Sequence, residues 1–393
     1  MVTSPSGRRI GRARAAVTAL AVVLGLATLP AVRDGLWATL FLADFVAGPK
    51  PTLYKRLTEA PAVTGHCLTG DGPGIPYDLY TPPGRPRAAA VLTHGMAHRG
   101  RRDPRVRQQA ERLARAGYLV MAPDLARMQA YGLSFDDVEA AARCVRFVAS
   151  QPSVEGLTVG AVAPSFGAGP VLIALSRPEV RDLCDFALIF GGYYDLKRTL
   201  EYTLTGAYNA EGYRGRIDPI VNRHNRWKFL HGNVGLLPES DSRSLLAHIA
   251  AERIEDPGRA DGHLVARLEP VERLVLEFMA NETPARFDSL YDCLPQPLTA
   301  WVDTFSLDHY SDQIHSRLLI VHSDADDKVS FTEGLSLSRN LPAAPPPRLA
   351  VVSVFQHMDL NLSWSSASAV IGQGLPDALT LWRLAYDLMR QRR

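Results

Sequence analysis

The fold is decided by the stretch Val159-Gly160-Ala161-Val162-Ala163-Pro164-Ser165-Phe166-Gly167-Ala168-Gly169. An apolar run leads into a serine flanked by small residues, and residues 170–175 then have a helical pattern. Small residues two positions before and after a serine let a strand and a helix pass close together, so that the hydroxyl is held out at a sharp turn. The stretch therefore predicts a strand, a strained turn and a helix, with Ser165 as a candidate nucleophile. Serines between small residues also occur in ordinary turns, so the rest of the chain must support this interpretation.

A candidate acid follows another apolar run. Residues 318–321 have the pattern of a short buried strand and lead into a loop with three aspartates, Asp324, Asp326 and Asp327. A strand that ends in such a loop places carboxylates at the carboxyl edge of a sheet, where open α/β folds bind ligands. The spacing after the strand favours Asp326, and the other two are interpreted as turn formers or caps. Asp195, just past an earlier strand, is a fallback acid.

A candidate base comes after the last predicted strand. Residues 349–355 are apolar, and His357 lies in the loop that follows them. An acyl-transfer serine needs a base to take its proton and an acid to orient that base. The order Ser165, Asp326, His357 supplies both, although His357 paired with Asp359 is the alternative interpretation.

Candidate oxyanion donors lie upstream. Residues 88–93 form an apolar run, and a loop starts directly after it at His94. A developing oxyanion must be bound by preorganised N–H groups. The expected donors are the N–H of Phe166, which follows the nucleophile, and the N–H of Met96, with Ala97 as the alternative. His94 is interpreted as a residue that holds this loop in place.

With these residues in place, the chain resembles the α/β-hydrolase superfamily, especially the branch of esterases, dienelactone hydrolases and prolyl-oligopeptidase-like enzymes. The resemblance covers roughly residues 77–393. It rests on the elbow around Ser165, the loop around Asp326, and the segments Leu92-Thr93-His94-Gly95-Met96, Tyr118-Leu119-Val120-Met121-Ala122-Pro123-Asp124 and Phe355-Gln356-His357-Met358.

The resemblance implies an α/β-hydrolase fold, in which helices cover both faces of a mostly parallel sheet and a helical cap is inserted. It also implies a serine hydrolase that needs no cofactor and no metal and that takes a small-molecule ester or related acyl substrate. The chain departs from the usual pattern at Ala163, where glycine is usual, at Pro164, and at Ser323. The substrate stays open because one fold supports many chemistries.

Composition and charge exclude some classes of protein. The chain has 393 residues, of which 46% are hydrophobic and 21% charged, with a formal net charge of +2. The basic residues at the N-terminus account for this excess, so the remainder has no basic stripe that would suggest nucleic-acid binding. The four cysteines have no metal-like spacing. If the protein is exported, one disulfide is possible, and its pairing stays open.

The N-terminal segment predicts a membrane partner. Four arginines between positions 8 and 14 precede an uncharged apolar stretch over residues 15–32, close to the ~20 residues that a membrane span needs. We expect a single uncleaved anchor at the cell membrane, with the catalytic part outside the cytoplasm. A cleaved signal, giving a secreted or periplasmic protein, is the alternative. A buried N-terminal helix is a third interpretation.

The pattern of elements predicts four regions: residues 1–48 as tail and anchor, 49–192 as the first part of the core, 193–310 as the cap, and 311–393 as the second part of the core. Residues 48–61 are interpreted as a linker. Strands are expected over residues 77–80, 88–93, 118–122, 157–162, 186–190, 318–321 and 349–355. Helices are expected over residues 105–116, 135–150, 170–175, 245–254, 270–280 and 377–390.

These observations lead to one expected function and its alternatives. We expect a serine hydrolase that cleaves a carboxylic ester, or a related acyl bond, through Ser165, Asp326 and His357 and an acyl-enzyme intermediate. A catalytically silent binding module tethered to the membrane is one alternative. An acyltransferase or peptidase that uses the same three residues is another.

Overall fold

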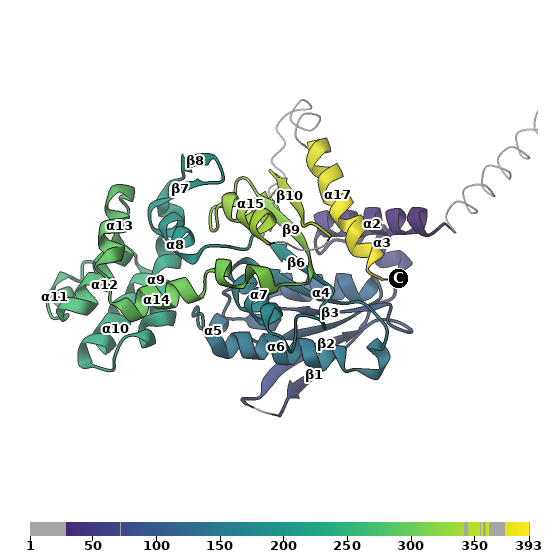
Figure 1. The fold of residues 1–393 in the computed structure, drawn as a ribbon, viewed down its shortest axis with the longest axis horizontal. Helices are drawn as coiled ribbons and strands as arrows, with labels where there is room; N and C mark the ends of the chain where they lie inside the picture. The colour runs from purple at the N-terminus through teal and green to yellow at the C-terminus, as the bar shows by residue number, and fades with distance from the viewer. Residues whose placement is uncertain are drawn as a thin grey trace, which may run out of the picture.

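The computed structural model describes residues 29–70, 72–341, 345–353, 355–356, 359–360 and 374–392. Its centre is an eight-stranded sheet with the order β1-β2-β4-β3-β5-β6-β9-β10 (Figure 1). Strand β2 pairs antiparallel with β1 and β4, and the remaining pairs in this sheet are parallel. The strands are β1 (Ala62–Leu68), β2 (Ile75–Thr81), β3 (Ala88–Leu92), β4 (Tyr118–Pro123), β5 (Val159–Pro164), β6 (Phe186–Phe190), β9 (Arg317–Ser323) and β10 (Arg348–Val352).

Helices cover both faces of this sheet. On one face α6 (Phe135–Ala149), α7 (Ala168–Ser176) and α15 (Phe331–Asn340) contribute to the larger hydrophobic cluster. On the other face α2 (Pro30–Ala47), α4 (Pro104–Arg115) and α17 (Leu375–Arg390) form the second cluster. The short helix α5 (Ala126–Gln129) follows β4. The prediction of an α/β fold with a mostly parallel, doubly covered sheet is therefore confirmed.

The central strands follow directly from their sequences. Every residue of β3, β4 and β5 is buried, as expected for parallel strands with helices on both faces. The edge strand β1 was not predicted. All of its residues except Leu68 are exposed. A strand without a buried face needs no alternation of apolar and polar residues, so this sequence gives no strand signal.

The segment before β1 differs from the predicted linker. Within residues 48–61, helix α3 (Leu53–Leu57) is capped by the Thr52 side chain, which accepts a hydrogen bond from the Lys55 N–H. Tyr54 is fully buried, and its hydroxyl donates to the Arg112 carbonyl at 2.6 Å. The linker interpretation was wrong because one buried aromatic residue fixes this otherwise polar stretch.

Helix α2 packs along α17 and is joined to α4 by a buried ion pair. Arg112 Nε lies 2.8 Å from Asp44 Oδ2. Burial alone would raise the pKa of Asp44, but the Thr52 hydroxyl and the Arg112 guanidinium lower that pKa below its usual range. The apolar residues around Asp44 thus belong to a packed helix.

The predicted anchor lies almost entirely outside the described residues. Of residues 15–32, the structure describes only the last four: Leu29 is the N-cap of α2 and residues 30–32 are its first residues. In the part of the chain that the structure describes, no helix has both the length and the apolar character needed to cross a membrane.

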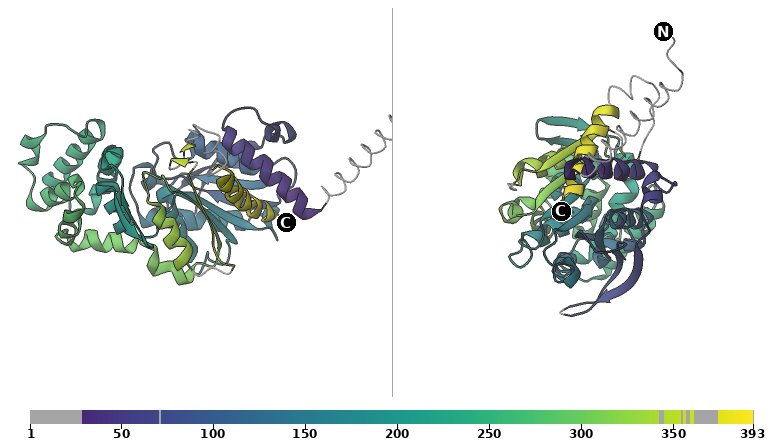
Figure 2. Two further views of the ribbon diagram at one scale, coloured as in Figure 1. Left: turned by 90° about the horizontal axis from the view of Figure 1, so that it is seen from above. Right: turned by 90° about the vertical axis from the view of Figure 1, so that its right-hand side faces the viewer.

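A largely helical segment connects β6 to β9 and lies at one end of the sheet (Figures 1 and 2). We call residues 193–310 the cap segment. A hairpin of β7 (Ala207–Ala210) and β8 (Tyr213–Arg216) was not predicted. The helices are α8 (Leu196–Thr205), α9 (Arg223–Asn233), α10 (Asp241–Glu255), α11 (Gly262–Val265), α12 (Pro270–Ala280), α13 (Pro284–Asp292) and α14 (Gln296–Thr304).

The end of the core also differs in detail from the prediction. The expected strand over residues 349–355 is β10, which ends at Val352. Two short strands, β11 (Phe355–Gln356) and β12 (Asp359–Leu360), then pair antiparallel. The chain leaves the main sheet at Ser353, whose N–H donates to Asp377 Oδ2 at 2.7 Å. All four cysteines are free thiols.

Candidate active site

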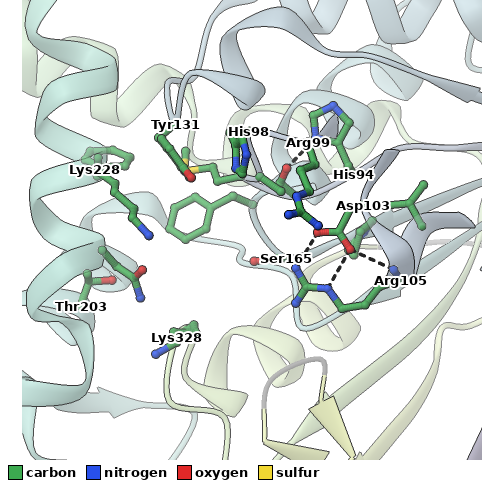
Figure 3. Close-up of a pocket in the computed structure, with 18 of the residues that line it drawn as sticks. His94, His98, Arg99, Asp103, Arg105, Tyr131, Ser165, Thr203, Lys228 and Lys328 are labelled. Carbon is green, nitrogen blue, oxygen red and sulfur yellow. Dashed lines mark hydrogen bonds and ion pairs between the residues drawn. The ribbon is translucent and has the colours of Figure 1, made fainter. Parts of the chain in front are cut away.

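Ser165 lies at the sharp turn between β5 and α7, as the first residue of a short 3-10 turn, η3 (Ser165–Gly167). Its φ is +54°, and only Tyr131 and Glu211 share a positive φ among the described residues other than glycine. Such a conformation costs on the order of 1–3 kcal/mol and persists only where surrounding contacts impose it. The Ser165 side chain lines a cavity (Figure 3). The sequence pattern therefore produces the strained turn that it predicts.

Close backbone packing explains the glycines around this turn. A Cβ at Gly167 would lie 2.5 Å from the His94 carbonyl oxygen, well inside van der Waals contact. A Cβ at Gly95 would lie 3.1 Å from Ser165 Cβ. Ala163, at the position where glycine is usual, is fully buried in the larger hydrophobic cluster. Its methyl group fits there, so this departure leaves the turn intact.

His94 holds the loop that faces Ser165. The Leu125 N–H donates to His94 Nε2 at 3.0 Å, and His94 Nδ1 lies 2.7 Å from the Gly95 carbonyl oxygen. Nε2 must accept and Nδ1 must donate, which defines one neutral tautomer. Burial lowers the pKa of His94, in keeping with this neutral form. Both ring nitrogens are engaged by the backbone, as expected for a structural histidine.

The candidate oxyanion donors belong to two segments of the chain that line the same cavity as Ser165. Phe166 is in the first turn after β5, where helical N–H groups lack an intrahelical partner. The N–H groups of Met96 and Ala97 donate to no other described residue. Met96, Ala97 and Phe166 all line the same cavity as Ser165.

Asp326 is buried in the loop after β9. Its Oδ1 accepts hydrogen bonds from the N–H groups of Lys328 at 2.8 Å and Val329 at 3.0 Å. Its Oδ2 lies 3.6 Å from Nε2 of His322, which is also buried. These contacts fix the carboxylate at the carboxyl edge of the sheet, two strands from the end of β5.

The other candidate acids have separate partners. Asp324 Oδ2 accepts a hydrogen bond from the Ser353 hydroxyl at 2.7 Å, and Asp327 Oδ2 lies 3.2 Å from Lys328 Nζ. Asp195 caps helix α8 by accepting from the Arg198 N–H at 3.0 Å. The candidate base, His357, lies outside the described residues.

The cap segment forms hydrogen bonds with the loop between β9 and α15, residues 324–330, which we call the acid loop. The Tyr202 hydroxyl donates to the carbonyl of Asp326 at 2.6 Å, and Asn222 Nδ2 donates to the carbonyl of Asp327 at 2.6 Å. Burial raises the pKa of Tyr202, so its hydroxyl remains a donor. The sequence showed Tyr202 only as one of several cap aromatics. No local signal predicts its partner, because Tyr202 and Asp326 meet only in the folded chain.

The cavity at Ser165 lies between the sheet edge and the cap segment and has a volume of about 500 Å³. The ring of Phe166 packs against Phe229 of α9, with centroids 6.1 Å apart, and thus joins the turn to the cap segment. The cavity lining includes Leu200, Thr203, Asn222, Asn225, Lys228 and Phe229 from the cap segment, and Lys328 from the acid loop. Figure 3 shows Thr203 and Lys228 across the cavity from Ser165.

No protein-family model matches this chain, and no curated protein matches it. Several solved structures are similar to it, and these neighbours are α/β-hydrolases. The esterase Est1E of Butyrivibrio proteoclasticus is 14% identical, with a TM-score of 0.46 over 83% of this chain and 98% of that one. The esterase Pf2001 of Pyrococcus furiosus is 12% identical, with a TM-score of 0.46 over 88% and 95%.

A third similar structure, the dienelactone hydrolase of Anabaena variabilis, is 14% identical, with a TM-score of 0.41 over 84% of this chain and 99% of that one. At these identities and TM-scores the similarities carry no argument about chemistry. The functional argument therefore rests on the residues of this chain.

Proposed function

We propose that this protein is a serine hydrolase of the α/β-hydrolase type that cleaves carboxylic esters. The observation that carries the proposal is the position of Ser165. Its hydroxyl lines a cavity, its φ of +54° belongs to a turn between a buried strand and a helix, and the loop at Gly95 packs against it. An ordinary structural serine has no need of this strained conformation.

In the proposed reaction, His357 takes the proton of Ser165 as Oγ bonds to the ester carbonyl carbon. Negative charge moves to the carbonyl oxygen, where the N–H groups of Met96 and Phe166 bind it. The bond to the alcohol then breaks, and His357 returns the proton to the leaving oxygen. Water then loses a proton to His357 as it attacks the acyl carbon. The bond from the acyl carbon to Ser165 Oγ breaks, His357 returns the proton to Oγ, and the acid product leaves. Asp326 orients His357 and stabilises its charged form.

The Asp326 contacts favour its part in this scheme. Two backbone N–H groups hold one carboxylate oxygen, and the Tyr202 hydroxyl holds the backbone of the same residue. These contacts fix the orientation of the carboxylate. The neighbouring aspartates are engaged with Ser353 and Lys328.

The substitution Ser165→Ala tests the proposal. Hydrolysis of 4-nitrophenyl butyrate should fall about 10⁴-fold or more, because loss of a nucleophile removes the acyl-enzyme route. Ser150→Ala is a suitable control, since Ser150 is an exposed residue at the end of α6 and, among the described residues, its hydroxyl bonds only to the Phe147 carbonyl. Full activity in Ser165→Ala would contradict the proposal.

We also propose that residues 15–32 anchor the protein in the cell membrane, with Ser165 outside the cytoplasm. The basic residues before this apolar stretch support that orientation. The full chain should remain in the membrane fraction after alkaline extraction, and added protease should reach its catalytic part in cells whose outer barriers have been removed. Release into the soluble fraction would contradict the anchor.

A further inference from the structure

The wall of the Ser165 cavity carries an excess of positive charge. Four cationic side chains line it, Arg99, Arg105, Lys228 and Lys328, whereas Asp103 is the only carboxylate among the described residues that line it. Charges of one sign around a cavity with low-dielectric walls reinforce one another and attract ions of the opposite sign. A cation that already has a carboxylate partner in the protein attracts a bound anion less than one without such a partner.

Two of the four cations have carboxylate partners. Arg105 binds Asp103 through two contacts, Nε to Oδ1 at 3.0 Å and a second nitrogen to Oδ2 at 2.9 Å. Lys328 Nζ lies 3.2 Å from Asp327 Oδ2 and donates to the Val221 carbonyl at 3.0 Å. The charges of these two side chains are largely balanced within the chain.

The other two cations, Arg99 and Lys228, form no such contact, although the charge of Arg99 also acts on Asp103. Neither has a carboxylate oxygen within 4.0 Å among the described residues. Lys228 is half-buried, and its Nζ lies 5.4 Å from the centre of the Tyr131 ring. Burying an ammonium group partly in a cavity costs free energy unless an anion meets it.

The position of Lys228 indicates where such an anion would lie. Lys228 belongs to α9 in the cap segment, and Figure 3 shows its amine pointing into the cavity, with Ser165 on the opposite side. Thr203 and Asn225 provide polar groups on the same wall, whereas Leu200 and Phe229 provide apolar surface. One substrate molecule in this cavity would therefore meet the nucleophile at one end and an unbalanced cation at the other.

We propose that the cavity selects esters that carry a second, anionic group, and that Lys228 binds this group. A carboxylate is the simplest such group. The proposal rests on the proposed function, because it assigns the substrate class of the same site. The carboxylate can belong to the acyl part, as in a monoester of a dicarboxylic acid, or to the alcohol part.

Matched pairs of esters distinguish these two forms. For the acyl part, 4-nitrophenyl hydrogen adipate is compared with 4-nitrophenyl hexanoate. For the alcohol part, 4-acetoxybenzoate is compared with phenyl acetate. In at least one pair we expect kcat/KM for the anionic ester to exceed that for the neutral ester about tenfold or more, as expected for a charge-assisted contact. The preference should shrink as NaCl is raised from 20 to 500 mM.

The substitution Lys228→Met tests whether Lys228 binds the anionic group of the substrate. It should reduce the ratio of kcat/KM between anionic and neutral ester about tenfold, mainly through a higher KM for the anionic ester. Arg223→Gln is the matched control, because Arg223 is an exposed cation on the same helix, pairs with Glu282 and does not line the cavity. This control should keep the wild-type ratio.

Two results would overturn the proposal: equal kcat/KM within both ester pairs, or a preference that survives Lys228→Met. If no ester at all is hydrolysed, the proposed function fails and a binding measurement decides this inference separately. Calorimetric titration of the Ser165→Ala protein with monomethyl adipate should then show binding that is lost in the Ser165→Ala, Lys228→Met double variant. Absence of binding to the Ser165→Ala protein would overturn it.

Discussion

The two walls of the Ser165 cavity are built in different ways. On the sheet side, the backbone determines the geometry, through the positive φ of Ser165 and the close approach of Gly95 and Gly167 to their neighbours. On the cap side, the ends of longer side chains such as Lys228 and Phe229 form the surface. A backbone-built wall tolerates little change, whereas side chains are replaced easily. We infer that the sheet side supplies the chemistry and the cap side selects the substrate.

The two walls are nevertheless connected. Tyr202 and Asn222 of the cap segment donate hydrogen bonds to two successive carbonyls of the acid loop. The Phe166 ring contacts Phe229, which in turn packs against Trp301 with centroids 6.1 Å apart. Substitutions on the cap side should therefore fall into two groups. One group changes the preference between substrates, and the other changes the position of the Asp326 carboxylate.

The largest effect after loss of the nucleophile is expected on the sheet side, from Asp326→Asn. Replacement of the carboxylate should lower kcat about 10³- to 10⁴-fold, because the amide no longer stabilises a charged imidazole. Ester hydrolysis by the purified variant measures this, with thermal unfolding to verify the fold. The variants Asp324→Asn and Asp327→Asn serve as comparisons. A larger loss in either of them would assign the acid to that residue.

Glycine substitutions test the claim that the sheet-side wall is built from backbone. Gly167→Ala should destabilise the protein by about 1–3 kcal/mol, because its Cβ would lie 2.5 Å from a backbone oxygen that has little freedom to move. Gly95→Ala should have a smaller effect on stability, since the new Cβ would lie 3.1 Å from its nearest neighbour, Ser165 Cβ. Denaturant unfolding compares the two variants. Equal stability of Gly167→Ala and the wild type would contradict this account of the turn.

Tyr202→Phe tests whether the cap side affects catalysis through the hydrogen bond from Tyr202 to the Asp326 carbonyl. Removing the hydroxyl leaves the buried Asp326 carbonyl without its 2.6 Å partner, and we expect a fall in kcat of about tenfold. Because the effect acts through the acid, the pH profile of kcat should shift as well. The ratio between anionic and neutral esters should stay as in the wild type. A change in that ratio with an unaltered pH profile would place Tyr202 in substrate selection.

The smallest predicted effect concerns His94 and pH. Burial lowers the pKa of His94 in the folded protein, so below its unfolded value of about 6.5 the unfolded chain binds a proton that the folded one does not. The contribution of His94 to stability is therefore complete above pH 6.5 and is lost as the pH falls toward the folded pKa. Denaturant unfolding between pH 7.5 and 5 should show a weaker pH dependence in His94→Gln. An unchanged slope would contradict the neutral tautomer.

The sequence predicted the parts of the molecule that are built from continuous local patterns. The runs that became β3, β4 and β5 are buried throughout, and the small residues around Ser165 specify the turn locally. The edge strand β1 and the β7–β8 hairpin were missed because their residues are mostly exposed or half-buried and carry no periodic signal.

The cap-side residues of the candidate site were also missed, for a different reason. Lys228 lines the same cavity as Ser165, and Tyr202 bonds to Asp326. In both cases the two residues are more than 60 positions apart in the chain. Their positions depend on how the whole cap segment packs against the sheet edge. No short pattern in the sequence encodes that packing, whereas the strained turn at Ser165 is encoded within a few residues.

Covalent labelling tests the central claim most directly. A fluorophosphonate probe reacts with a serine that its surroundings have activated, and mass spectrometry of the digested protein identifies the modified residue. We predict a single adduct on Ser165 that is lost in His357→Ala, in a protein that remains folded by circular dichroism. An adduct on another residue, or none on the folded protein, would contradict the assignment of Ser165 as an activated nucleophile.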